Sequence, residues 1–76
     1  MVFEPVHFHN TIAQHREEKL MTQATLAWHV GISRQGLFKI ENNLVIPSVL
    51  TAMKLSHYLE VSIEKLFLSD WQYFED

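Results

Sequence analysis

The chain has 76 residues and a formal net charge of −3 at pH 7, from 6 lysines and arginines against 9 aspartates and glutamates. This length allows one domain over residues 1–76 with a modest core, to which dimerisation would add buried surface. A hydrophobic content of 47%, with two glycines and two prolines, favours a compact helical fold over disorder. The absence of cysteine excludes disulfides and thiolate metal sites and fits a reducing cytoplasm, and no apolar run is long enough to span a bilayer.

The first part of the chain predicts a strand followed by a helix. Residues 2–8 are rich in β-prone side chains, and Pro5 restricts such a strand to the edge of a sheet. Asn10 is a candidate N-cap for a helix over residues 11–19. The apolar side of this helix includes Arg16, so the sequence predicts that this guanidinium needs an acidic partner in the interior.

Two short helices that meet at a tight turn are predicted by the stretch TQATLAWHVGISRQGLFKIE. Thr22 can cap a helix over residues 23–29, and Gly31 can adopt the left-handed conformation that ends it. Ser33 can cap a second helix over residues 34–41, which turns apolar residues inward at helical spacing. Its outward face is expected to carry large and mostly hydrogen-bonding side chains, namely Arg34, Gln35, Phe38 and Lys39. This arrangement is typical of a helix-turn-helix unit.

The second half of the chain predicts a loop, two helices and a terminal strand. Ser48 can cap a helix over residues 49–59, whose apolar stripe is wide enough to predict packing on two sides. In the preceding loop, we expect Leu44 and Ile46 to be tucked beneath the chain. Two further elements are predicted after this helix, a short helix over residues 63–67 capped by Ser62 and a strand over residues 69–75 that pairs antiparallel with residues 2–8. The alternative for the last segment is a frayed acidic tail.

Six motifs at fixed spacing span about residues 10–68: REEK at 16–19, TQATLA at 22–27, GISRQ at 31–35, KIEN at 39–42, PS at 47–48 and VSIEKLF at 61–67. In these motifs the chain resembles the lambda-repressor-like family of the Cro/CI type, and within it the small stand-alone repressors of the cytolysin-repressor type. The resemblance implies an all-α, five-helix DNA-binding domain, with a small antiparallel strand pair made by the two chain ends. It also implies that Arg16 pairs with Glu41, and it marks Leu20 and Asn43 as departures, because relatives usually carry glycine at both places.

The expected DNA contacts lie on and around the helix over residues 34–41. Arginine and lysine suit guanine, glutamine suits adenine and an apolar ring suits the thymine methyl group, so the candidate base-reading residues are Ser33, Arg34, Gln35, Phe38 and Lys39. Phosphate contacts come from polar side chains and from backbone near helix ends, which makes the candidates Thr22, Gln23, Gly36, Asn42 and Asn43. The alternative is a solvated helix face for Arg34, Gln35 and Lys39, and a cap or a turn for the two asparagines. For Phe38 it is a partly buried role in the core, and for Gly36 a neutral substitution.

The sequence thus predicts a cytoplasmic transcription regulator, a repressor that binds a pseudo-palindromic operator as a homodimer and is not an enzyme. The expected dimer interface is at Leu66, Leu68 and Trp71. No cofactor, metal, membrane or small-molecule ligand is expected, because the five histidines lack a completed ligand set and no nucleophile is paired with a base. The alternative function is a protein-interaction module on the same scaffold, such as an antitoxin, an accessory subunit or an acidic decoy of a DNA-binding protein.

Overall fold

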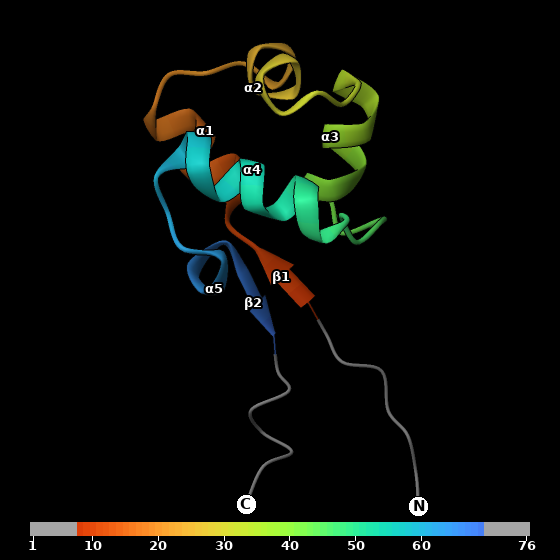
Figure 1. Cartoon of the computed structure of the whole chain (residues 1–76), viewed down its shortest axis with the longest axis vertical. Coiled ribbons are helices and arrows are strands. Elements are labelled where there is room, and N and C mark those ends of the chain that lie inside the picture. Colours follow the sequence, from red (N-terminus) through yellow and green to blue (C-terminus); the bar gives the residue numbers. More distant parts are fainter. Residues whose placement is uncertain (1–7, 70–76) are drawn as a thin grey trace, which may run out of the picture.

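The computed structural model describes residues 8–69, which form five helices and a two-stranded sheet (Figure 1). In chain order the elements are β1 (Phe8–Asn10), α1 (Ile12–Glu18), α2 (Gln23–Val30), α3 (Arg34–Glu41), α4 (Val49–Leu59), α5 (Ile63–Leu66) and β2 (Phe67–Ser69). In Figure 1, α4 crosses the middle of the molecule, with α2 on one side of it and the sheet on the other. The expected fold class, an all-α domain of five helices with a small strand pair, is confirmed.

The two strands pair antiparallel, but closer to the middle of the chain than expected. The register joins Phe8 to Ser69, His9 to Leu68 and Asn10 to Phe67. The backbone N–H of Thr11 also donates to the carbonyl of Leu66 at 2.8 Å, which continues the pairing into the end of α5. Most of the two ranges predicted as strands, 2–7 and 70–75, lies outside the described residues.

Serine and threonine side chains begin four of the helices, as the sequence predicts. Each hydroxyl accepts a backbone N–H from the first turn, which satisfies a donor that has no partner inside the helix. The caps of α2 to α5 are Thr22, Ser33, Ser48 and Ser62. For α1 the expected position is off by one residue, because Thr11 occupies the N-cap position without a side-chain cap bond. Asn10, one residue earlier, still accepts the N–H of Ile12, the first residue of α1, through its Oδ1.

Four residues with positive φ mark the turns in the described part of the chain. Gly31 ends α2 with a φ of 78°, as predicted, and glycine adopts this conformation without steric cost. Leu20 and Asn43, at the two places where relatives usually carry glycine, have φ values of 59° and 60°. The loops therefore keep the left-handed geometry without glycine. Glu60, at the end of α4, also has positive φ, at 58°.

One cluster of nine buried side chains forms the core, and every helix contributes to it. Its members are Ile12, Leu26, Ala27, Val30, Leu37, Ile40, Leu55, Leu59 and Leu66. Two expectations are wrong here: Leu44 and Ile46 are 66% and 74% exposed, because their loop runs across the surface, and Leu66 is fully buried. Since the core of its own chain encloses Leu66, this side chain is not on the surface that a dimer partner would contact.

Within residues 8–69, no helix combines the length and the apolar character needed to cross a membrane.

Candidate nucleic-acid interface

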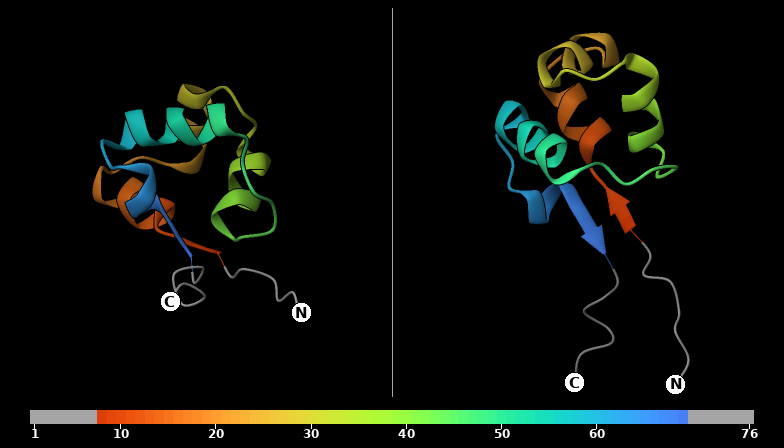
Figure 2. Two further views of the ribbon diagram at one scale, coloured as in Figure 1. Left: turned by 60° about the horizontal axis from the view of Figure 1, so that its bottom comes forward. Right: turned by 45° about the vertical axis from the view of Figure 1, so that its right-hand side comes forward.

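Helix α3 has one face in the core and one face open to solvent. Leu37 and Ile40 are buried in the core, at the i, i+3 spacing of a single helix face. On the other side Arg34, Gln35 and Lys39 are exposed, and Phe38 is 46% exposed. Figure 2 shows α3, the yellow-green helix, along one edge of the molecule. The four long side chains are therefore presented together, as the sequence predicts.

The exposed surface of α2 and α3 carries positive charge without exposed acids. From Thr22 to Asn43 the charged residues are Arg34, Lys39 and Glu41. The carboxylate of Glu41 is only 4% exposed and is paired with Arg16. A surface of this kind attracts phosphate even though the whole chain is negative, because binding responds to the local field.

A buried ion pair fixes the end of α3 to α1. The Nε of Arg16 donates to Glu41 at 2.8 Å and one of its terminal nitrogens donates at 3.2 Å, so the contact is bidentate. The other terminal nitrogen donates to the carbonyl of Met21 at 2.9 Å. The hydrogen bond to Glu41 raises the pKa of Arg16 and outweighs the lowering by burial. This confirms the predicted pair, which holds α3 in position on the body of the domain.

Gln23 connects this ion pair to the first residue of α3. Its Nε2 donates to Glu41 at 2.9 Å, and its Oε1 accepts from a terminal nitrogen of Arg34 at 3.4 Å. An amide nitrogen has two hydrogens, so one remains available for a phosphate. The side chain expected to bind phosphate is thus held in a fixed orientation by Glu41.

Asn10 makes a second attachment at the C-terminal end of α3, and sequence reasoning missed this role. Its Oδ1 accepts from the N–H of Ile12 at 3.1 Å. Its Nδ2 lies within hydrogen-bonding distance of the carbonyls of Ile40 (2.9 Å) and Glu41 (3.2 Å) and of the Oδ1 of Asn43 (2.8 Å). Asn10 therefore donates to carbonyls in the last turn of α3, where the helix itself supplies few partners; the carbonyl of Ile40 also accepts the N–H of Asn43 at 3.1 Å. Proximity to a helix start was the only signal in the sequence, and it indicated the contact with Ile12 but not the contacts with α3.

The two asparagines after α3 have different roles. Asn42 donates its Nδ2 to the carbonyl of Phe38 at 2.8 Å and so closes the last turn of α3. The Oδ1 of Asn43 accepts a hydrogen bond from Asn10. The Nδ2 of Asn43, which can only donate, therefore points away from Asn10. Among the phosphate candidates, Asn43 thus has a donor in a fixed orientation, whereas Asn42 serves the helix end.

Two other phosphate candidates use their donors within the chain. The hydroxyl of Thr22 donates to the hydroxyl of Thr25 at 3.0 Å while it caps α2. The N–H of Gly36 donates to the hydroxyl of Ser33 at 2.9 Å. Either group would have to break an internal hydrogen bond before it could donate to DNA.

Residues 12–66 match the family model described as Helix-turn-helix. The chain belongs to this family, in its Cro/CI type. It is 34% identical over 59 residues to an uncharacterized HTH-type transcriptional regulator of Methanocaldococcus jannaschii, a match that covers 78% of this chain and 89% of that protein. The N-terminal DNA-binding domain of SinR from Bacillus subtilis has a similar fold, with a TM-score of 0.64 and 37% identity over 70% of this chain and 78% of that one. SinR in complex with DNA gives the same TM-score and identity, over 86% of that chain.

Proposed function

We propose that this transcription regulator binds a pseudo-palindromic DNA operator as a homodimer and represses transcription by occupying the promoter. Helix α3 of each copy would enter the major groove of one half-site, with the two half-sites about one helical turn apart. The observation that carries the proposal is the exposed α2–α3 surface, where Arg34, Gln35 and Lys39 lie together and the one acid is buried. DNA-bound SinR, with 37% identity, supports it.

The base-reading roles follow from the chemistry of the exposed side chains. Gln35 can pair with the adenine edge through two hydrogen bonds, and Arg34 and Lys39 can donate to guanine. Phe38, about half exposed, can pack against a thymine methyl group. Ser33 lies next to this set but already caps α3, so we assign it the weakest role in reading bases.

Phosphate contacts are assigned to Gln23 and Asn43, at opposite ends of the α2–α3 unit. Each has an amide donor left over after an internal hydrogen bond has fixed its orientation. Phosphate contacts set the register of a protein on the duplex but carry no sequence information. These two residues would therefore position α3 for the base contacts made by its exposed side chains.

The experiment is selection of bound sequences from a randomised duplex library at two salt concentrations, with Gln35→Ala as the variant. Wild type should enrich an inverted repeat, with affinity that falls steeply as salt rises. Gln35→Ala should lower the specific affinity by about 1–3 kcal/mol and relax the preference at one base position of each half-site. Wild type without any enriched sequence, or a variant with an unchanged preference, would contradict the proposal.

The alternative of an acidic decoy for another DNA-binding protein is disfavoured. A decoy needs exposed acids on the surface that imitates DNA, whereas the exposed residues between Thr22 and Asn43 include none.

A further inference from the structure

A continuous stretch of the surface is both apolar and uncharged. The 12 residues from Asn42 to Met53 carry no charged side chain, although the chain as a whole is 20% charged. Within this stretch six apolar side chains are between 45% and 77% exposed: Leu44, Val45, Ile46, Val49, Leu50 and Met53. We call these six residues the 44–53 apolar surface. It covers the α3–α4 loop and the outer face of the first half of α4. This face is part of the wide apolar stripe from which the sequence predicts that α4 packs on two sides.

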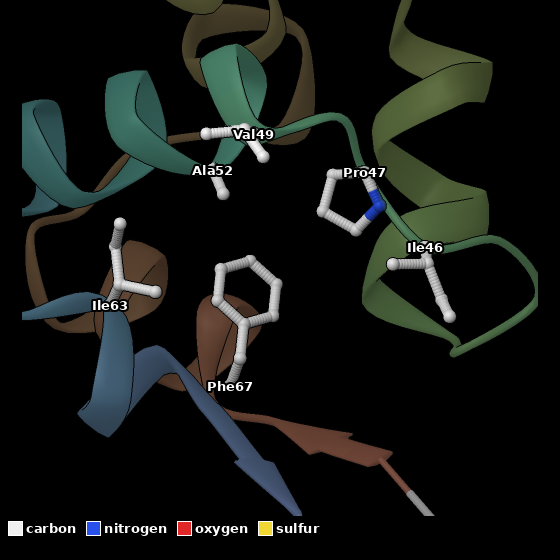
Figure 3. A pocket seen from close by; sticks show the side chains of 6 residues that line it. All are labelled: Ile46, Pro47, Val49, Ala52, Ile63 and Phe67. Atoms are coloured by element: carbon white, nitrogen blue, oxygen red, sulfur yellow. The ribbon is translucent and has the colours of Figure 1, made fainter.

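An open pocket of about 180 Å³ adjoins this surface (Figure 3). Four parts of the chain line it: Ile46 and Pro47 in the loop, Val49 and Ala52 on α4, Ile63 on α5 and Phe67 on β2. In Figure 3 the ring of Phe67 faces the hollow from the side of the sheet, while Val49 and Ala52 approach it from α4. Ile46 and Val49 are 74% and 77% exposed, so the lining includes two of the most exposed apolar side chains of the described chain.

We propose that a second copy of this chain covers the 44–53 apolar surface and the adjoining pocket, and that this contact forms the dimer. A two-fold interface brings the same patch of both copies together, so the patch must be compatible with itself. An uncharged patch meets this requirement, since two copies with a net charge of −3 would repel each other through a charged one. A partner with strong charge, in contrast, would find nothing here to pair with.

The size of the patch also fits this occupant. A Val, Leu, Ile or Met side chain buries about 60–120 Å² on full transfer from water, so six that are between 45% and 77% exposed offer about 230–450 Å² per copy. A standard interface buries about 800 Å² per partner, of which about 65% is apolar in homodimers. The 44–53 apolar surface therefore supplies much of the apolar area of such an interface, and the loop, α5 and β2 around the pocket can supply more.

The position of this surface suits the proposed function, on which the inference rests. The α3–α4 loop follows directly from the C-terminal end of α3, so two copies joined there would have both α3 helices near the two-fold axis. One residue of the interface expected from the sequence is corrected, because Leu66 is enclosed in the core. The side chain of Leu68 and the whole of Trp71 lie outside the part of the chain that the structure describes, so these two stay predictions. We place the contact on the exposed apolar residues of the loop and α4.

The test compares the dimer dissociation constant of the full chain and of two variants by sedimentation equilibrium. Val49→Glu puts a charge into the proposed contact, yet Val49 is the first residue of α4, where an acid is favourable for the helix. Trp28→Glu is the matched control, because Trp28 is 78% exposed on α2, away from the pocket. We expect Val49→Glu to raise the dissociation constant at least 100-fold and Trp28→Glu to change it less than 3-fold. Ile46→Glu, in the loop, should act like Val49→Glu and does not depend on helix stability.

The possible outcomes separate this inference from the proposed function. The inference would be overturned if the wild-type protein stayed monomeric at a concentration 100 times higher than the one that saturates DNA. The 44–53 apolar surface would then be left to a different partner. Variants at Val49 and Ile46 that still dimerise like wild type would overturn it as well. If these variants become monomers that bind a single half-site but lose the inverted repeat, the inference holds and so does reading by α3. Dimerisation without any sequence preference would instead contradict the proposed function alone.

Discussion

Loss of Glu41 should destabilise the protein far more than loss of a surface charge. The carboxylate accepts two hydrogen bonds from Arg16 and one from Gln23, and the side chains of Arg16 and Glu41 are only 11% and 4% exposed. Glu41→Ala leaves the guanidinium with the carbonyl of Met21 at 2.9 Å and with the exposed carboxylate of Glu17 at 4.0 Å, which solvent screens. Removal of one partner of a buried pair costs about 3–5 kcal/mol, mainly because the other charge is stranded. For a domain of this size, that loss lowers the melting temperature by about 12–40 °C.

The assay is urea unfolding followed by circular dichroism, with Lys19→Ala as the matched control. Lys19 pairs with Glu60 at 3.5 Å, but these side chains are 35% and 78% exposed, so the control should lose less than about 1 kcal/mol. The double variant Arg16→Leu/Glu41→Leu should recover most of the stability, because it leaves no stranded charge. If Glu41→Ala costs no more than Lys19→Ala, the buried pair is not what holds α3 in place.

Two further substitutions test features of the loops and of α3. Leu20 is 93% exposed with a φ of 59°, so Leu20→Gly should relieve backbone strain and raise the free energy of unfolding by about 1 kcal/mol. Leu20→Ala keeps the strain and should give no such gain. Equal gains for the two variants in urea unfolding would contradict the argument. Asn10→Ala should cost about 2 kcal/mol, because it removes contacts to two carbonyls and to Asn43, whereas Asn42→Ala, with one exposed contact, should cost less than about 1 kcal/mol. In folded protein Asn10→Ala should also weaken DNA binding by a similar factor for all sequences, and a selective loss at one base would point to a different role.

The sequence predicted the features that depend on neighbouring residues. Cap positions follow from a hydroxyl or glycine at the end of a helical pattern, which is why Thr22, Ser33, Ser48 and Gly31 were placed correctly. The Arg16–Glu41 pair could be predicted because both residues interrupt an apolar stripe and the family resemblance matches them. A charge on an inward face needs a partner, and this need is visible in the pattern itself.

The sequence did not predict contacts that depend on how distant segments meet. Asn10 reaches residues 30 to 33 positions away, and nothing in its local pattern indicates those carbonyls. Apolar spacing shows which side of a segment is apolar, but it does not show whether another element covers that side. Ile46 was therefore expected to be buried and is exposed, whereas Leu66 was expected on a dimer surface and is buried.

Thr11 can make its contact with α5 only late in synthesis of the chain. Its hydroxyl donates to the carbonyl of Lys65, 54 residues later, whereas the partners of Asn10 at the end of α3 are complete once Asn43 has emerged. Contacts between residues far apart in the chain form later, because a longer loop must close first. The α2–α3 unit and the attachments at both of its ends can thus form on a growing chain. The sheet, and the pocket wall that Phe67 provides, must wait for almost all of the described residues, so a nascent chain can form α3 and its attachments before it completes the pocket beside the 44–53 apolar surface.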